Sequence, residues 1–242
     1  MTDQLFVRYH WKSENPDPVV VAYMEKNYPK DLTYFDFAKD FKAMDFNASN
    51  IAEIVQATGA RYFVFTSKHH EGFTMFPSKT TFGWNSVDVG PKRDIVMELK
   101  VAIEETKGVK FGLYFSLMAW FHQLFLNDVA MNRTDYVEQQ SYPQLLELTN
   151  KYKPQIIWSD GDWDRSDTYW KSKEFLAWLF NDSPVSKEVV VNDRWGSGCM
   201  GKHGGFLTFA DNYDPGVLIL RKWENCDTID KYSWASTCLC LT

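Results

Sequence analysis

The sequence predicts an α/β protein with the architecture of a (β/α)8 barrel. Short apolar runs alternate four times with helical patterns, at intervals of roughly 45 residues. This alternation favours a parallel sheet with helices outside it. Each apolar run also ends in polar residues, and barrels of this kind carry their chemistry just past the carboxyl ends of their strands. A doubly wound sheet is the alternative, but no glycine-rich phosphate loop follows the first run.

Four predicted units each consist of a capped helix followed by a strand. Asn50 and Glu53 have the spacing of a capping box at the first helix, and Gly59 suits its end. Pro143, in the first turn, and Pro154, after the last, delimit the third helix. The expected helices begin at Asn50, Asp94, Ser141 and Asp167, and the expected strands cover residues 61–67, 109–116, 155–159 and 188–192.

No linker or low-complexity segment divides the chain before residue 196, and glycine-rich loops dominate after it. We therefore expect one domain over residues 1–242, with five or six strands between Arg61 and Asp211. Residues 206–210 supply the last candidate strand.

Composition excludes some classes of partner. The 242 residues include 26 Lys and Arg against 32 Asp and Glu, and this net charge of −6 argues against binding to nucleic acid. No apolar run approaches the roughly 18–20 residues of a membrane span, and the polar start of the chain does not predict a signal peptide. Aromatic residues make up 17% of the chain, with ten Trp. Many must serve packing, but such rings also form flat walls that stack on sugars.

The cysteines and glycosylation sequons bear on the compartment. None of the four cysteines has the spacing of a zinc site, and Cys199 could pair with Cys226 in an oxidising compartment. The other two cysteines are Cys238 and Cys240. Sequons at Asn47, Asn132 and Asn181 weakly favour a secretory route.

Carboxylates near the strand ends suggest glycoside hydrolysis, which requires one carboxyl on each side of the scissile bond. Asp160 directly follows an apolar strand and suits the nucleophile, although a turn residue is the simpler interpretation. The second carboxyl is Asp211 or Glu224. We favour Asp211 because Glu224 follows the basic pair 221–222 and could form an ion pair with it.

Histidine and arginine side chains lie near the same predicted edge. His69 and His70 would face opposite ways on a strand, so we expect one of them to point into the site. Arg194 could clamp a substrate oxygen or bind Asp193. A metal site is conceivable from the histidines and acids, but the spacing matches no common metal motif, so we expect neither a metal nor another cofactor.

Together these motifs resemble the retaining α-L-fucosidases of animal lysosomes and plasma. The resemblance covers about residue 20 to Trp234, and the stretch Pro215–Cys226 matches the family signature at each specified position. The other matching stretches are residues 27–29, 67–73, 84–86, 90–94, 112–114, 120–122, 152–154, 158–161, 191–195 and 203–206.

The resemblance implies roles for particular residues. Asp160 matches the nucleophile, and His69 and His70 match the pair that contacts fucose hydroxyls. Asp211 matches the acid/base position favoured for animal enzymes, and Glu224 matches the older assignment. The implied sugar-binding positions are Tyr114, Trp158, Arg194 and Trp84.

The same resemblance implies a partner and a compartment. The substrate would be a fucosylated glycan, the location lysosomal or secreted, and a homo-oligomer is possible in the full-length family. No cofactor is implied.

The chain also departs from the family. A first barrel strand with a His-Trp-Gly motif would lie before residue 1, and Ala119 and Gln123 stand where animal enzymes carry Glu and Pro. After Trp234 the family continues into the last barrel strands and a β-sandwich, which we do not find. We therefore expect an incomplete barrel, lacking its first and last strands. A non-catalytic fucose-binding fragment and a metal-dependent barrel hydrolase stay open as alternatives.

Overall fold

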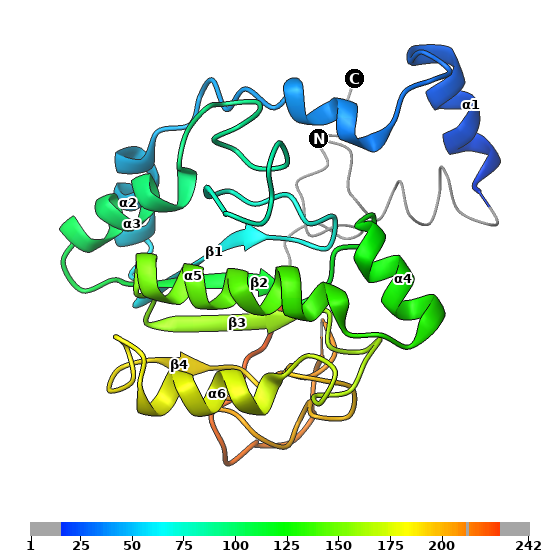
Figure 1. The fold of residues 1–242 in the computed structure, drawn as a ribbon. Coiled ribbons are helices and arrows are strands. Elements are labelled where there is room, and N and C mark those ends of the chain that lie inside the picture. The colour runs from blue at the N-terminus through cyan, green and yellow to red at the C-terminus, as the bar shows by residue number, and fades with distance from the viewer. Residues whose placement is uncertain (1–15, 212, 228–242) are drawn as a thin grey trace.

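The computed structural model describes residues 16–211 and 213–227. Its centre is a four-stranded sheet in the order β1-β2-β3-β4, and all neighbouring strands are parallel (Figure 1). The predicted α/β class with a parallel sheet is confirmed. The strands are β1 (Tyr62–Lys68), β2 (Lys110–Ser116), β3 (Ile156–Asp160) and the short β4 (Val190–Val191).

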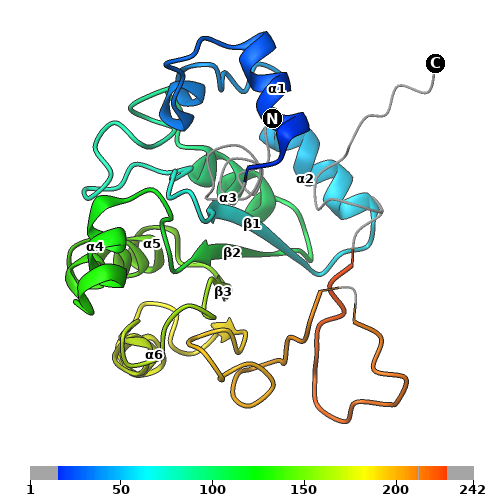
Figure 2. The same cartoon turned by 90° about the vertical axis from the view of Figure 1, so that its right-hand side faces the viewer.

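Helices pack against this sheet and form the core with it. Helix α3 contacts β1, β2 and α5, and its apolar residues Ile95, Leu99 and Ile103 are buried. Figure 2 shows the last described loops extending away from α4, α5 and α6. The helices are α1 (Pro18–Asn27), the 3-10 helix η2 (Tyr34–Lys39), α2 (Ala48–Ala57), α3 (Ile95–Glu105), α4 (Gln123–Met131), the π-helical turn η3 (Val137–Ser141), α5 (Tyr142–Tyr152) and α6 (Ser172–Asn181).

Strand register brings the carboxyl ends of the strands together. Ser116 at the end of β2 is the register partner of Asp160 at the end of β3. The pairing of β1 with β2 shifts between Thr66 and Lys68, as at a β-bulge, which bends a strand and re-aims its side chains. The segments that follow these ends therefore converge on one edge of the sheet.

Several predicted boundaries were wrong. Helix α2 is the first of the four helices expected from the sequence. It is capped by Asn47 rather than Asn50, because the Asn47 side chain accepts the Asn50 N–H over 3.0 Å. Asp94 caps its helix as predicted. The helix expected to begin at Ser141 is preceded by η3, so the helical segment of η3 and α5 begins before Ser141. The helix expected to begin at Asp167 is α6, which begins at Ser172.

The predicted strand count was also wrong. The described residues hold four strands rather than five or six, and residues 206–210 contribute only an isolated bridge from Leu207 to Trp223. A sequence run reports β propensity, whereas a strand needs a paired neighbour.

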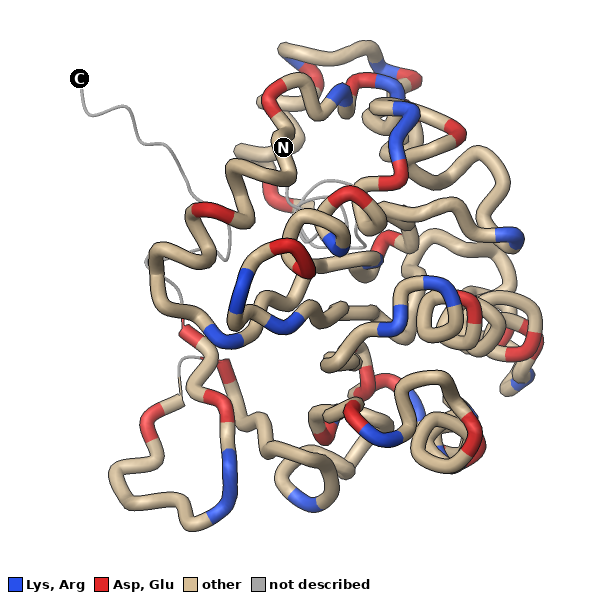
Figure 3. The backbone as a smooth tube through the Cα atoms, turned by 90° about the vertical axis from the view of Figure 1, so that its left-hand side faces the viewer, with Lys and Arg blue, Asp and Glu red and all other residues tan. Residues whose placement is uncertain are grey.

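The cysteines, the charged residues and the apolar length of the helices complete the description of the fold. Cys199 and Cys226 are free thiols, so the pairing considered from the sequence is not formed, while Cys238 and Cys240 lie outside the described residues. Acidic and basic residues are interspersed along the backbone (Figure 3). Among the described residues, no helix is long and apolar enough to cross a membrane.

Candidate active site

Asp160 lies at the carboxyl end of β3 and is only 7% exposed. Its Oδ2 accepts a hydrogen bond from the Tyr114 hydroxyl over 2.6 Å. Its Oδ1 accepts one from the Arg194 guanidinium over 3.2 Å. A buried carboxylate needs such partners to remain charged, and here each oxygen has one.

A cavity of about 490 Å3 opens beside this carboxylate. Aromatic rings wall it: the Tyr114 ring stacks on His69 at 5.3 Å and on Trp158 at 5.2 Å between centroids. Flat rings of this kind match the apolar face of a sugar. The lining comprises Val64, Thr66, His69, Tyr114, Trp158, Asp160, Arg194, Asp211, Glu224 and Cys226.

Arg194 is the positive centre of the cavity. Its guanidinium lies 4.7 Å above the Trp158 ring and contacts Asp211 over 3.3 Å as well as Asp160. It does not bind Asp193, the alternative considered from the sequence, because the Asp193 carboxylate accepts hydrogen bonds from Thr208 and from the Gly201 N–H. Burial opposes the charge of Arg194, but the carboxylates of Asp160 and Asp211 raise its pKa.

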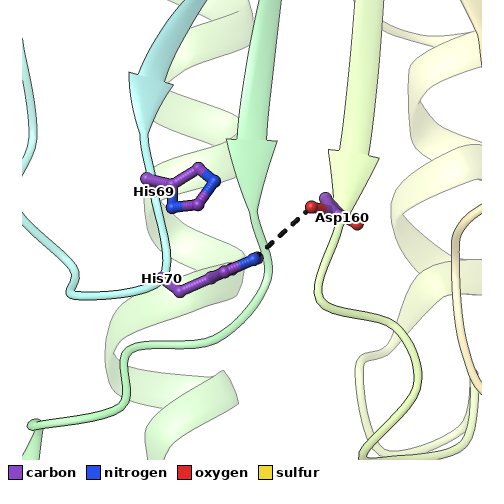
Figure 4. Close-up of side chains that lie close together, drawn as sticks. All are labelled: His69, His70 and Asp160. Atoms are coloured by element: carbon purple, nitrogen blue, oxygen red, sulfur yellow. Dashed lines mark ion pairs between the residues drawn. The ribbon is translucent and has the colours of Figure 1, made fainter. Parts of the chain in front are cut away.

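Both histidines lie beside Asp160 instead of facing opposite ways (Figure 4), and of the two only His69 lines the cavity. The His70 Nε2 atom lies 3.5 Å from Asp160 Oδ2, and the His69 and His70 rings are 4.1 Å apart. Strand alternation does not apply because β1 ends at Lys68. Ser116 Oγ fixes the His70 ring, at 2.7 Å from Nδ1.

The same three side chains could offer metal ligands. One ligand atom from each of His69, His70 and Asp160 lies within 4.8 Å of the others. However, Asp160 also pairs with the guanidinium of Arg194, and a cation bound there would be repelled by that charge. The arrangement suits an organic substrate better than a metal ion.

The two candidates for the second carboxyl differ in their partners. Glu224 Oε2 accepts a hydrogen bond from the Trp158 indole over 2.6 Å. Its basic neighbour Arg221 points elsewhere and binds the carbonyls of Lys202 and Gly204. Asp211 instead pairs with Arg194. The sequence argument for Asp211, the absence of a cationic neighbour, thus fails in three dimensions.

Burial controls the protons around the site. It raises the pKa of Tyr114 well above its usual value, and the nearby Asp160 adds to the rise, so this phenol stays protonated. It also raises the pKa of Asp162 to about 6 and that of Cys226 to about 12.

The structure separates one predicted residue from the site and adds others. Trp84 does not line this cavity; it borders two smaller ones, and its indole N–H donates to the Glu71 carbonyl over 3.1 Å. Val64 and Thr66 line the site and were missed. Their signal was the period-two alternation within residues 61–67, which sets every second residue on one face.

A carboxylate in an aromatic-walled cavity, at the carboxyl edge of a parallel sheet, is typical of glycoside hydrolases. Comparison with known proteins narrows this class. A model of the alpha-L-fucosidase family matches residues 3–237, and the chain belongs to this family.

Curated relatives and solved structures agree with this assignment. The chain is 61% identical to a putative alpha-L-fucosidase of Caenorhabditis elegans over 94% of its own length and 47% of the relative's. It is 51% identical to the human plasma alpha-L-fucosidase over 93% of its length and 49% of that protein. The structure of Thermotoga maritima alpha-fucosidase in complex with fucose matches with a TM-score of 0.64 and 31% identity, over 78% of this chain and 44% of that one. The chain thus spans about half the length of the curated relatives it matches.

Proposed function

We propose that the protein containing this chain is a retaining α-L-fucosidase that releases terminal α-L-fucose from glycoproteins or glycolipids. The observation that carries the proposal is the pair of contacts on Asp160, a hydrogen bond from Tyr114 and an ion pair with Arg194, in a cavity that also contains Glu224. The four parallel strands would be part of a complete (β/α)8 barrel. A structure solved with fucose, and similar to this one, supports the choice of sugar.

Asp160 would act as the nucleophile. Its carboxylate attacks the anomeric carbon, the glycosidic bond breaks, and a fucosyl ester forms. Water then attacks the same carbon from the face that the leaving group vacated, so the two inversions give net retention. The aromatic wall of Tyr114 and Trp158 would hold the ring, while His69 and His70 would bind its hydroxyls.

Glu224 is our choice for the acid/base, in place of the sequence preference for Asp211. The acid must give its proton to the leaving oxygen and then take one from water. Protonating Asp211 would remove a negative partner from the buried Arg194 guanidinium, which costs electrostatic free energy. Glu224 has no ion pair with a basic side chain among the described residues and shares its cavity with Asp160.

The name of one relative supports a proposal on location. Because one relative is named a plasma enzyme, we propose a secreted or lysosomal location for the complete protein. A homo-oligomer is compatible with this proposal.

The reaction is best tested in a chimera, in which this chain replaces the matching segment of a curated relative. Asp160→Gly should lower turnover of an aryl α-L-fucoside by several orders of magnitude, and added azide should partly restore it with formation of fucosyl azide. Near wild-type turnover in this variant would refute the assignment. Fucose binding without any turnover in the unmodified chimera would instead support the non-catalytic alternative, and loss of turnover with a chelator would support the metal-dependent one.

A further inference from the structure

We propose that the larger of the two cavities bordered by Trp84 is a second carbohydrate site. It would bind one neutral pyranose ring and is distinct from the cavity that contains Asp160. The inference builds on the proposed action on glycans, whose further rings would need a place to bind. This Trp84 cavity measures about 200 Å3 and lies between η2 and the start of α4, with Phe35, Trp84 and Phe121 among its walls. It is smaller than the ~300–1,000 Å3 of sites for drug-sized ligands, which suits a single ring.

His70 and Trp120 separate the two cavities. The Trp120 N–H donates to the His70 carbonyl over 2.7 Å, and the two rings lie 4.8 Å apart. On one side His69 lines the catalytic cavity. On the other side Glu71 and Ala119, the chain neighbours of His70 and Trp120, line the Trp84 cavity. The two cavities therefore lie on either side of the His70–Trp120 contact and share no lining residue.

The walls of the Trp84 cavity have the rings that a pyranose stacks on. The Phe35 and Trp84 rings meet edge to face at 4.7 Å, and Phe35 also contacts Phe121 at 6.4 Å. Phe82 belongs to the same lining and is 96% exposed. One exposed Phe is ordinary, but here several rings share one cavity with polar side chains, and their flat apolar faces can pack on the apolar face of a sugar.

Hydrogen-bond donors reach the same cavity. Lys68 belongs to this lining and is 1% exposed, and its Nζ is held by the Tyr136 hydroxyl over 3.1 Å and by Gln144 Oε1 over 3.4 Å. The Nδ1 atom of His122 accepts the Leu124 N–H over 3.2 Å. In the neutral ring, the Nε2 atom of His122 therefore carries the hydrogen.

The charges favour a neutral ligand over an anion. Burial lowers the pKa of Lys68 to about 7 despite the nearby Glu71 carboxylate, and burial together with Lys68 lowers the pKa of His122. Neither base thus brings a full positive charge at neutral pH, while Glu71 would repel an anion. Donors from Lys68 and His122 and acceptors from Glu71 and Gln140 match hydroxyl groups, which donate and accept.

The test measures binding of two neutral pyranoses, methyl β-D-galactopyranoside and N-acetyl-D-glucosamine, to the chimera by saturation-transfer difference NMR. We expect at least one to bind, and saturating L-fucose not to displace it. Phe82→Ser changes an exposed lining residue and should leave the fold intact. Phe82→Ser should weaken binding about fivefold, the size of a lost aromatic contact. Phe180→Ser, on α6 and 44% exposed, is the matched control and should bind as the unmodified protein does.

Two further results separate this proposal from the proposed function. Asp160→Asn should weaken binding of L-fucose and leave the other sugar unaffected. If neither probe binds, if L-fucose displaces it, or if Phe180→Ser weakens it as much as Phe82→Ser, the second site is refuted. If a probe binds as expected but L-fucose does not bind, the second site stands and the proposed function fails.

Discussion

The hydroxyl of Tyr114 on β2 donates to the carboxylate of Asp160 on β3 over 2.6 Å. Tyr114 is the register partner of Trp158, two residues before Asp160, so strand pairing sets this contact. Because burial keeps the phenol protonated, it remains a donor while Asp160 is charged. With Arg194 on the other oxygen, both oxygens of the carboxylate are held by donors, which positions it for attack.

Removing this hydroxyl should slow the reaction. In the chimera, Tyr114→Phe should lower kcat roughly 10- to 100-fold, because a hydrogen bond to a charged group contributes about 1.5–3 kcal/mol. The ring that stacks on His69 and Trp158 is retained, so KM should change less. Steady-state kinetics with an aryl α-L-fucoside measures both constants. Tyr142→Phe, on α5 and outside the cavity, is the control, and equal effects in the two variants would contradict the role given to Tyr114.

Sequence patterns predicted the sheet and the ends of its strands because those features are local. An apolar run followed by Ser-Asp-Gly identifies both β3 and the position of Asp160. The cap at Asp94 is equally local, since its side chain binds the N–H of Met97 three residues later. Both predictions required only near neighbours along the chain.

Contacts between distant residues could not be predicted in this way. The preference for Asp211 depended on its chain neighbours, whereas its cationic partner Arg194 is 17 residues away. Trp84 was grouped with the sugar site by resemblance, but the fold places it against Phe35 and the Glu71 carbonyl. The bend of the chain after Lys68 brings both histidines to Asp160, and no alternation rule describes it.

Substitution of the two candidate acids should identify the one that donates the proton. Glu224→Gln should lower kcat/KM for a fucosyl disaccharide by about 10²–10⁴, the usual contribution of a general acid. The same variant should retain much more activity on fucosyl fluoride, whose leaving group needs little protonation. Kinetics with the two substrates gives this ratio directly.

Asp211→Asn is the matched variant, because it also replaces one carboxyl by an amide in the same cavity. It should affect both substrates alike, since its main effect would be on Arg194. If the disaccharide-specific loss occurs in Asp211→Asn and not in Glu224→Gln, the assignment is reversed.

Stability should depend on the proton held by Asp162. This carboxyl is 3% exposed, its Oδ1 has no hydrogen-bond partner among the described residues, and burial with the nearby Asp160 raises its pKa to about 6. An acid with a raised folded pKa binds its proton more tightly when folded, so stability falls as pH rises from about 4 to about 6 and stays lower above that. Asp162→Asn should therefore increase the free energy of unfolding more at pH 7 than at pH 4, by at most about 3 kcal/mol.

Denaturant unfolding of the chimera at the two pH values measures this difference. The exposed Asp164, two residues later, provides the control Asp164→Asn, whose effect should be small at both pH values. Equal effects of Asp162→Asn at pH 4 and pH 7 would show that folding does not raise the pKa of this carboxyl.

Residues 1–242 expressed alone should associate and show little fucosidase activity. Among the described strands β1 pairs only with β2, its other edge is bonded only at its end, to Thr74 and Met75, and Tyr62 and Val64 on β1 are 48% and 37% exposed. An open strand edge with apolar side chains is a template for further pairing, and native stability of about 5–15 kcal/mol leaves little margin for such exposure. Light scattering should show large species for the isolated chain and monodisperse particles for the chimera.

Tyr62→Lys should reduce the association, because a charge on an edge strand blocks pairing, whereas Leu126→Lys on α4 should not. A monomeric 242-residue chain that hydrolyses an aryl fucoside as fast as the chimera would refute this prediction.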